Sequence, residues 1–299
     1  MLKNILGREP LVSVIMNCHN GDKYLNQSIR SVLDQTYKNW EIIFFDNNSK
    51  DKSSVILKKY KDKRIKYYKS TRLHTLYKAR NLAIKKSKGE LISFLDVDDW
   101  WIKNKIKKQV NIFLKNKNID VIFSNLFLYY QKEKKKIIYI KKKVNNGKIT
   151  QNLVDKFEMP ILTTVIKKNL FKKIKFDNRY TIIGDFDFFF RLSTLTNIKG
   201  IQEPLAYYRI HDSNLTANKI DLNIKELEIW IKEKIKSKKF KHINFSKIYE
   251  KIQILKITYN LKKDNKILAL IELFKRPFSF LKVRSLISFI VRNFLIKKL

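Results

Sequence analysis

Three carboxylates follow directly on an apolar run in this sequence. Residues 91–95 are apolar enough to form a buried strand, and Asp96, Asp98 and Asp99 come immediately after them. Ligands of open α/β sheets bind beyond the carboxyl ends of the strands, so these acids are expected at a binding crevice. Carboxylate oxygens are preferred ligands of Mg²⁺ and Mn²⁺, which would offset the repulsion between them. The alternative is that Asp98 or Asp99 caps a helix that begins near Trp100. Both interpretations are open on this segment alone.

Two further predicted strands, residues 11–17 and 41–46, also end in polar residues. The side chains concerned are Asn17, His19, Asn20, Asp46 and Asn47. A polar turn between a strand and a helix can present backbone N–H groups to a phosphate or a base. One such loop is more often an ordinary turn, but polar clusters from three strands at the same sheet edge favour a site. The sequence contains neither a glycine-rich dinucleotide fingerprint nor a Walker A motif.

Two later clusters add groups that could take part in a reaction. Asp185 and Asp187 stand among phenylalanines at the start of a predicted helix. An acid with apolar neighbours can have a raised pKa, which suits a general base, whereas the structural alternative is a cap plus an acid in the first turn. Arg209 and His211 end a predicted extended segment and suggest a phosphate partner and a metal ligand.

The order of predicted elements indicates an α/β fold. Strands are predicted at residues 11–17, 41–46, 65–69, 91–95, 120–124, 127–130, 136–142 and 198–210, and helices at 22–35, 52–60, 76–86 and 101–116. Alternating strands and helices with short connections are typical of a mostly parallel sheet flanked by helices. The boundaries that we predict are an N-terminal arm at 1–10, a catalytic domain at 11–216 and a helical, basic C-terminal region at 217–299.

The composition is strongly basic, with 65 Lys and Arg against 27 Asp and Glu and a net charge of +38. The excess creates a field that attracts polyanions, but it is scattered along the chain and contains no recognisable nucleic-acid-binding module. Nucleic acid is therefore not expected as a binding partner. The single Cys18 excludes an internal disulfide and favours a cytoplasmic location. No signal peptide and no membrane-spanning run is evident.

Taken together, these motifs resemble those of the family 2 glycosyltransferases, which have the GT-A fold. The resemblance covers about residues 11–216 and is carried by residues 12–17, 31–37, 40–43, 79–83, 89–99, 184–187 and 208–211. It implies an inverting transfer from a nucleotide-diphosphate sugar, with Mg²⁺ or Mn²⁺ as cofactor, in the synthesis of a bacterial surface polysaccharide. The implied acceptor is a hydroxyl of a glycan or of a lipid-linked molecule.

The resemblance also implies roles for individual residues. Asn17, His19, Asn20, Asp46, Asn47 and Arg80 would contact the nucleotide, Asp96 the nucleotide and the metal, Asp98 and His211 the metal, and Asp185 would be the catalytic base. The family commonly has two aspartates at the second strand end, where this chain has Asp46 and Asn47. An amide can still accept from and donate to a uracil or a thymine. A UDP-sugar is favoured as the donor.

The C-terminal region lies outside the resemblance. Its apolar positions Leu281, Ile287, Ile290, Val291 and Phe294 alternate with Lys and Arg. They could pack on the catalytic domain or lie in an anionic membrane surface, and the second interpretation is favoured because a lipid-linked acceptor would explain it. Two other functions are compatible with the sequence: a catalytically inactive glycan- or partner-binding protein, and a basic nucleic-acid-binding protein. The retained Asp96, Asp98 and Asp185 argue against the first.

Overall fold

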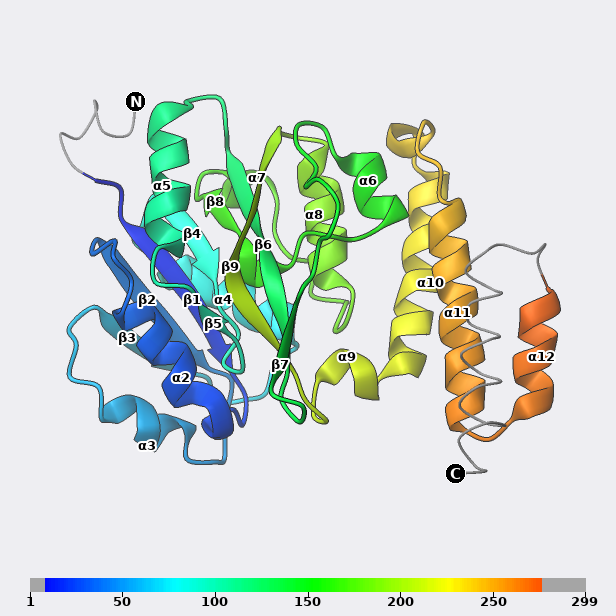
Figure 1. The fold of residues 1–299 in the computed structure, drawn as a ribbon, viewed down its shortest axis with the longest axis horizontal. Helices are drawn as coiled ribbons and strands as arrows, with labels where there is room; N and C mark the ends of the chain where they lie inside the picture. Colours follow the sequence, from blue (N-terminus) through cyan, green and yellow to red (C-terminus); the bar gives the residue numbers. More distant parts are fainter. Residues whose placement is uncertain (1–8, 276–299) are drawn as a thin grey trace. The chain divides into compact units, whose positions relative to one another are not determined.

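The computed structural model describes residues 9–275, and the chain divides into two compact units, residues 1–214 and 215–299. The first contains a nine-stranded mixed sheet and the second contains helices only among its described residues (Figure 1). The predicted α/β class is therefore confirmed for the first unit.

The strands of the first unit fall into a parallel half and a mixed half. They are β1 (Val12–Cys18), β2 (Trp40–Asp46), β3 (Ile65–Lys69), β4 (Leu91–Phe94), β5 (Trp100–Trp101), β6 (Val121–Tyr130), β7 (Lys135–Ile138), β8 (Val165–Lys167) and β9 (Ile198–Ile210). Their order in the sheet is β3-β2-β1-β4-β8-β6-β9-β5, with β7 paired to β6. Strands β1 to β4 are mutually parallel, so their carboxyl ends meet at one edge, whereas β8 runs antiparallel to β4.

Helices cover both faces of this sheet. They are α2 (Asp22–Leu33), α3 (Ser53–Lys58), α4 (Leu76–Lys86), α5 (Lys105–Lys115), α6 (Thr150–Asp155), the short 3-10 helix η1 (Ile161–Thr163), α7 (Leu170–Lys173) and α8 (Gly184–Ser193). Apolar side chains of α2 and α5 share one core cluster with alternate residues of β1, including Val12, Val14 and Met16. Every residue of β1 and of β2 is buried, as expected for strands covered on both faces.

Two predictions about local structure were wrong. Residues 120–124 and 127–130 are not separate strands but parts of β6, whose register with β9 shifts at Asn125. The Asn125 side chain accepts hydrogen bonds from Leu126 N and Ile140 N, and this local bonding keeps the strand continuous through the irregularity. Part of the strand predicted at 136–142 is present as β7, which pairs antiparallel with β6.

The second error concerns the segment after the acids. Trp100 and Trp101 begin no helix; they form the short strand β5, which pairs antiparallel with Tyr207 and Ala206 of β9. The following helix, α5, starts at Lys105 and has Asn104 at its N-cap. Neither Asp98 nor Asp99 is therefore a helix cap. The pairing of β5 with β9 instead brings the C-terminal end of β9 beside the acidic turn.

The second unit consists of helices. They are α9 (Leu215–Asn218), α10 (Ile220–Lys236), the 3-10 helix η2 (Lys238–Phe240), α11 (Ser246–Lys262) and α12 (Lys266–Phe274). In α12, Ala269 and Leu273 pack against Ile257 and Leu261 of α11. None of the helices within residues 9–275 is long and apolar enough to cross a bilayer. The apolar positions noted between residues 281 and 294 lie outside the described residues.

Candidate active site

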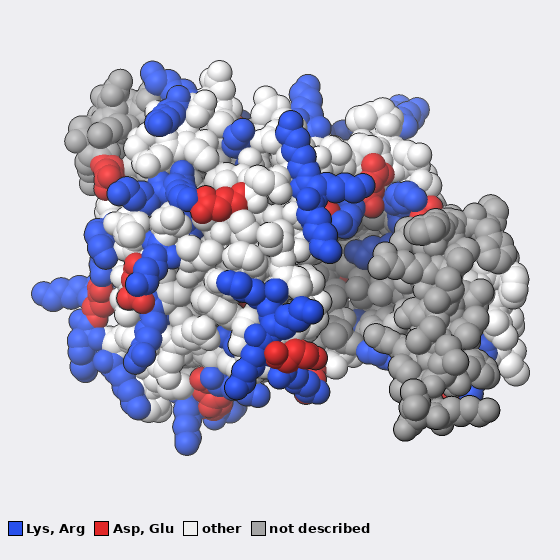
Figure 2. Space-filling model, in the orientation of Figure 1, with Lys and Arg blue, Asp and Glu red and all other residues white. Residues whose placement is uncertain are grey.

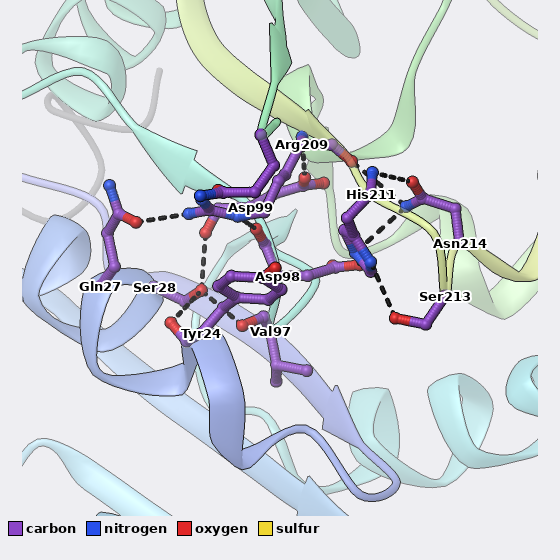
Figure 3. Close-up of polar contacts among 11 residues, drawn as sticks. Tyr24, Gln27, Ser28, Val97, Asp98, Asp99, Arg209, His211, Ser213 and Asn214 are labelled. Carbon is purple, nitrogen blue, oxygen red and sulfur yellow. Dashed lines mark hydrogen bonds and ion pairs between the residues drawn. The ribbon is translucent and has the colours of Figure 1, made fainter. Parts of the chain in front are cut away.

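The acidic turn after β4 is held from two sides by the protein (Figure 3). The Ser28 hydroxyl, on α2, lies 2.7 Å from the carbonyl oxygen of Val97 and 2.6 Å from that of Asp99. On the other side, Arg209 Nε donates to the carbonyl oxygen of Asp98 at 2.7 Å. These three hydrogen bonds hold the backbone of residues 97–99, from which the acidic side chains project.

Asp98 and His211 face each other at this turn. Asp98 Oδ2 lies 3.1 Å from His211 Nε2, and His211 Nδ1 lies 2.8 Å from the Ser213 hydroxyl. About a third of the Asp98 side chain is exposed. Two residues predicted as metal ligands, far apart in the sequence, are therefore brought together. Within residues 9–275 no group of three or more His, Cys, Asp or Glu side chains forms a metal cluster.

Asp99 differs from Asp98 in being buried. Its side chain is only 1% exposed, and its Oδ1 accepts a hydrogen bond from Arg209 N at 2.8 Å. Burial, with the neighbouring charges of Asp98 and Asp96, raises the pKa of this carboxyl well above its ordinary value. Asp99 therefore joins the turn to β9.

Arg209 is enclosed by the protein. Its guanidinium lies 4.2 Å from the ring centroid of Tyr24 and 4.5 Å from that of Trp100, and it also donates to the side chains of Gln27 and Gln131. Burial lowers its pKa, which the surrounding acids partly offset. At 4% exposure it braces the turn, in contrast to the phosphate contact suggested by the sequence. The aromatic side chains that enclose it were not predicted, because they come from α2 and β5.

A second chain of ionic contacts joins Asp185 to the turn. Arg80, on α4, contacts Asp185 Oδ1 at 2.5 Å and Asp96 Oδ1 at 2.8 Å. The arginine is 2% exposed. Burial lowers its pKa, but the two carboxylates more than offset that effect and the net shift is upward. The contact with a nucleotide stays a prediction for Arg80, whereas its position between two carboxylates is observed.

Asp185 lies in the first turn of α8 and is not its N-cap, which is Ile183. Burial raises the pKa of Asp185 to about 6; Arg80 lowers it and Asp96 raises it. The ring of Tyr77 packs so closely on Gly184 that a Cβ atom there would lie 2.3 Å from it. Glycine at this position lets α8 approach α4, which brings Asp185 to Arg80. Asp187 is fully buried and paired with Arg191, which indicates a structural role.

The ends of β1 and β2 contain both exposed and internally bonded groups. His19 and Asn20 are exposed, with His19 Nδ1 3.0 Å from the Asn47 carbonyl oxygen. Asp46 is fully buried and accepts hydrogen bonds from Ser49 N at 2.7 Å and from the Tyr67 hydroxyl at 2.8 Å.

The amide of Asn47 is likewise occupied by the chain. It donates to the carbonyl oxygen of His74 at 2.9 Å and accepts from the backbone N–H of His74 at 3.0 Å. Asn17 is different: it is 8% exposed, and neither atom of its amide has a hydrogen-bond partner among the described residues.

Tyr208 lies next to Arg209 on β9, and no role was predicted for it from the sequence. Burial raises its pKa, and the charges of Asp99, Asp98, Asp96 and Asp185 raise it further. Its position on β9, one residue before Arg209, is the signal that could have identified it. Side chains alternate along a strand, so Tyr208 faces away from the enclosure of Arg209.

Comparison with known proteins extends these observations. Residues 13–152 match the model of Glycosyl transferase family 2. The chain is 34% identical over 214 residues to the Escherichia coli UDP-Glc:alpha-D-GlcNAc-diphosphoundecaprenol beta-1,3-glucosyltransferase WfgD, a match that covers 70% of this chain and 81% of that protein.

Two solved structures are similar in fold. Staphylococcus aureus TarS 1-349 in complex with UDP-GlcNAc has a TM-score of 0.62 at 17% identity, covering 94% of this chain and 80% of that one. The mannosyltransferase PcManGT from Pyrobaculum calidifontis, in complex with GDP-Man and Mn²⁺, has a TM-score of 0.61 at 13% identity, covering 97% and 83%. The GT-A fold implied by the sequence is confirmed. The chain belongs to glycosyltransferase family 2.

Proposed function

We propose that this enzyme transfers a sugar from a UDP-sugar to a hydroxyl group of a glycan or lipid-linked acceptor, with inversion at the anomeric carbon. The observation that carries the proposal is the ionic chain from Asp185 through Arg80 to Asp96, at the sheet edge where Asp98 meets His211. A candidate base for the acceptor and candidate ligands for the donor thus lie in one polar network.

For the donor nucleotide, we assign contacts to Asn17, His19 and Asn20. The support is the Asn17 amide, whose donor and acceptor are buried without partners, beside two exposed polar side chains. A buried amide of this kind is costly unless a ligand or water satisfies it. Asp46 and Asn47 would act indirectly, by holding the backbone at Ser49 and His74 in place. Uridine is favoured because WfgD uses UDP-Glc and TarS binds UDP-GlcNAc in its complex.

A divalent cation fits the residues at the turn. Asp98 and His211 offer an oxygen and a nitrogen, and Asp96 precedes Asp98 by two residues in the same turn. Mg²⁺ is commonly held by one or two carboxylates together with substrate phosphates. The Mn²⁺ bound in PcManGT is a precedent in the same fold. When bound, the cation would neutralise charge on the departing nucleoside diphosphate.

For the acceptor, we assign Asp185 as the general base. Its carboxylate accepts the proton of the acceptor hydroxyl as the oxygen bonds to the anomeric carbon, and the bond from that carbon to the diphosphate breaks on the opposite face. A pKa of about 6 leaves the group mainly ionised at neutral pH while keeping it more basic than an ordinary aspartate.

Arg80 acts in this proposal as a positioning residue. Its two ion pairs orient Asp185 and Asp96 at the same time, and its burial allows little other movement. A bidentate guanidinium is suited to this task, whereas a lysine offers only a single point of charge.

Support for a lipid-linked acceptor comes from WfgD, which is a glucosyltransferase acting on alpha-D-GlcNAc-diphosphoundecaprenol. A lipid-linked acceptor would put the reaction at a membrane, and the single buried cysteine favours the cytoplasmic side. On the face drawn in Figure 2, the Lys and Arg of the first unit form several separate groups and not the single basic tract that nucleic-acid binding would use.

The test measures thermal stability of the protein with UDP, GDP or dTDP, each with and without Mn²⁺, followed by transfer from the matching sugar nucleotide. A ligand that binds only the native state raises its melting temperature. We expect UDP with Mn²⁺ to give the largest shift, and NMR of the product to show inversion. Stabilisation by GDP alone would refute uracil as the nucleobase of the donor. Nucleotide binding without any transfer would favour a catalytically inactive binding protein.

A further inference from the structure

Helix α12 has an apolar stripe on each of two sides. Ala269 and Leu273 face α11, as described above. The other apolar side chains are exposed: Ile267 (74%), Leu268 (45%), Leu270 (45%), Ile271 (47%) and Phe274 (68%). Residues in a helix advance by about 100° each, so positions 267, 270, 271 and 274 form a continuous outward stripe. A helix that only packed on its neighbour would have polar residues there.

Cations flank this outward stripe at both ends of the helix. Lys262, Lys263 and Lys266 lie before or at its start and Lys275 follows its end, and all four are exposed. Glu272, which contacts Lys275, is the sole acidic residue within α12. Long basic side chains beside an apolar helix face can lay their stems on apolar surface while their charges reach anionic groups.

The sequence beyond the described residues continues the same chemistry. Residues 276–299 contain no Asp or Glu, and their basic residues are Arg276, Lys282, Arg284, Arg292, Lys297 and Lys298. A protein partner would have to supply an apolar groove with an acidic rim. An anionic bilayer offers both features over an unlimited area, with acyl chains below a layer of negative headgroups.

We infer that the outward stripe of α12 docks on an anionic membrane surface. The helix has nine residues, which is too short to span a bilayer, so it lies in the interface with Ile267, Ile271 and Phe274 among the acyl chains. The flanking lysines then contact the headgroups. This inference concerns a surface of the second unit and does not depend on the identity of the donor or acceptor.

The experiment compares co-sedimentation of the full-length protein with vesicles of phosphatidylcholine alone and of phosphatidylcholine with phosphatidylglycerol. The test variant is Ile267→Gln/Phe274→Gln, which changes two exposed side chains and should leave the fold intact. The matched control is Ile229→Gln/Ile235→Gln on α10, where the side chains are 52% and 48% exposed. Circular dichroism and light scattering of each variant report folding and oligomeric state.

We expect wild type and control to bind the anionic vesicles equally within twofold, and the test variant to bind at least tenfold more weakly. Phosphatidylcholine alone should bind the wild type far less. Test-variant binding within twofold of wild type would overturn the inference, as would wild type that ignores anionic vesicles. A wild-type dimer that the test variant dissociates would also overturn it, since the stripe would then join two copies of the chain.

Discussion

Aspartates at two strand ends of the same sheet have opposite surroundings. At the end of β2, Asp46 is fully buried, and both of its oxygens accept hydrogen bonds from the chain itself. After β4, Asp96 and Asp98 are about one third exposed, and their partners are the side chains of Arg80 and His211. The hydrogen-bonding capacity of Asp46 is used within the fold, whereas Asp96 and Asp98 can still accept contacts from a ligand.

A position at the carboxyl edge of the sheet therefore does not by itself define a ligand contact. A carboxylate whose lone pairs are taken by backbone and tyrosine donors stabilises a loop. A carboxylate whose partner is a side chain of another element, such as Arg80 or His211, can exchange that partner for a ligand. We therefore expect substitutions at the two strand ends to affect different measurements.

Loss of the base should have the largest effect. Asp185→Asn keeps the size of the side chain but cannot accept the acceptor proton, so kcat should fall about 10³-fold. Binding of UDP with Mn²⁺, measured by thermal shift, should stay within twofold of wild type because the substitution leaves the donor residues in place. A variant that retains a tenth or more of wild-type kcat would remove Asp185 from the proposed role.

Substitution of Arg80 should have the next largest effect. Arg80→Lys keeps a charge but cannot bridge Asp185 and Asp96, so kcat should fall about 10²-fold while KM for the donor changes little. A residue that served mainly to bind the nucleotide would show the reverse, a raised KM with kcat retained. The split between kcat and KM, measured by initial rates, therefore decides between positioning and nucleotide binding.

Substitution of the buried Asp46 of β2 should lower the stability of the protein. Asp46→Ala leaves Ser49 N and the Tyr67 hydroxyl without an acceptor, which should lower the free energy of unfolding by about 2–3 kcal/mol. Asp98→Ala, as the matched substitution at the exposed strand end, should change it by less than about 0.5 kcal/mol yet abolish stabilisation by Mn²⁺ with UDP. Urea denaturation of both variants measures the contrast. Equal losses of stability would remove the distinction between the two strand ends.

The pH dependence should be the smallest effect. Because the pKa of Asp185 is raised to about 6, the carboxylate is protonated as pH falls through that value. The active form is the ionised one, so kcat/KM should decrease about tenfold between pH 7 and pH 5 and level off above pH 7. An acidic limb centred near pH 4 would indicate an ordinary aspartate, and the residual activity of Asp185→Asn should lack the limb at pH 6.

Much of the catalytic unit could be predicted from sequence because its signals are local. The apolar runs that become β1, β2 and β4 are buried on both faces, and the polar residues at their ends follow from chain order and parallel pairing. The termini of elements were less predictable. Trp100 and Trp101 are apolar and precede a helical pattern, and only pairing with Tyr207 and Ala206 makes them a strand.

Lys105 shows a further limit of the sequence. As a lysine among lysines at the start of α5, it is expected in solvent, yet it is fully buried. Its Nζ donates to the Ser93 hydroxyl at 2.9 Å and lies 4.0 Å from the Trp101 ring centroid, and burial lowers its pKa. The strand β5 determines this environment, and its pairing partner is about a hundred residues away in the sequence.

The class of fold and the acids of the turn could be predicted from residue type and neighbouring residues, and the resemblance to a known family singled out Asp185 as the candidate base. What those groups contact depends on the tertiary structure. It joined Asp185 to Asp96 through Arg80, set His211 against Asp98, and enclosed Arg209 between Tyr24 and Trp100. The physical reason is that partners and burial depend on packing between distant elements, and these determine whether a carboxylate or a guanidinium holds the fold together or remains available to a ligand.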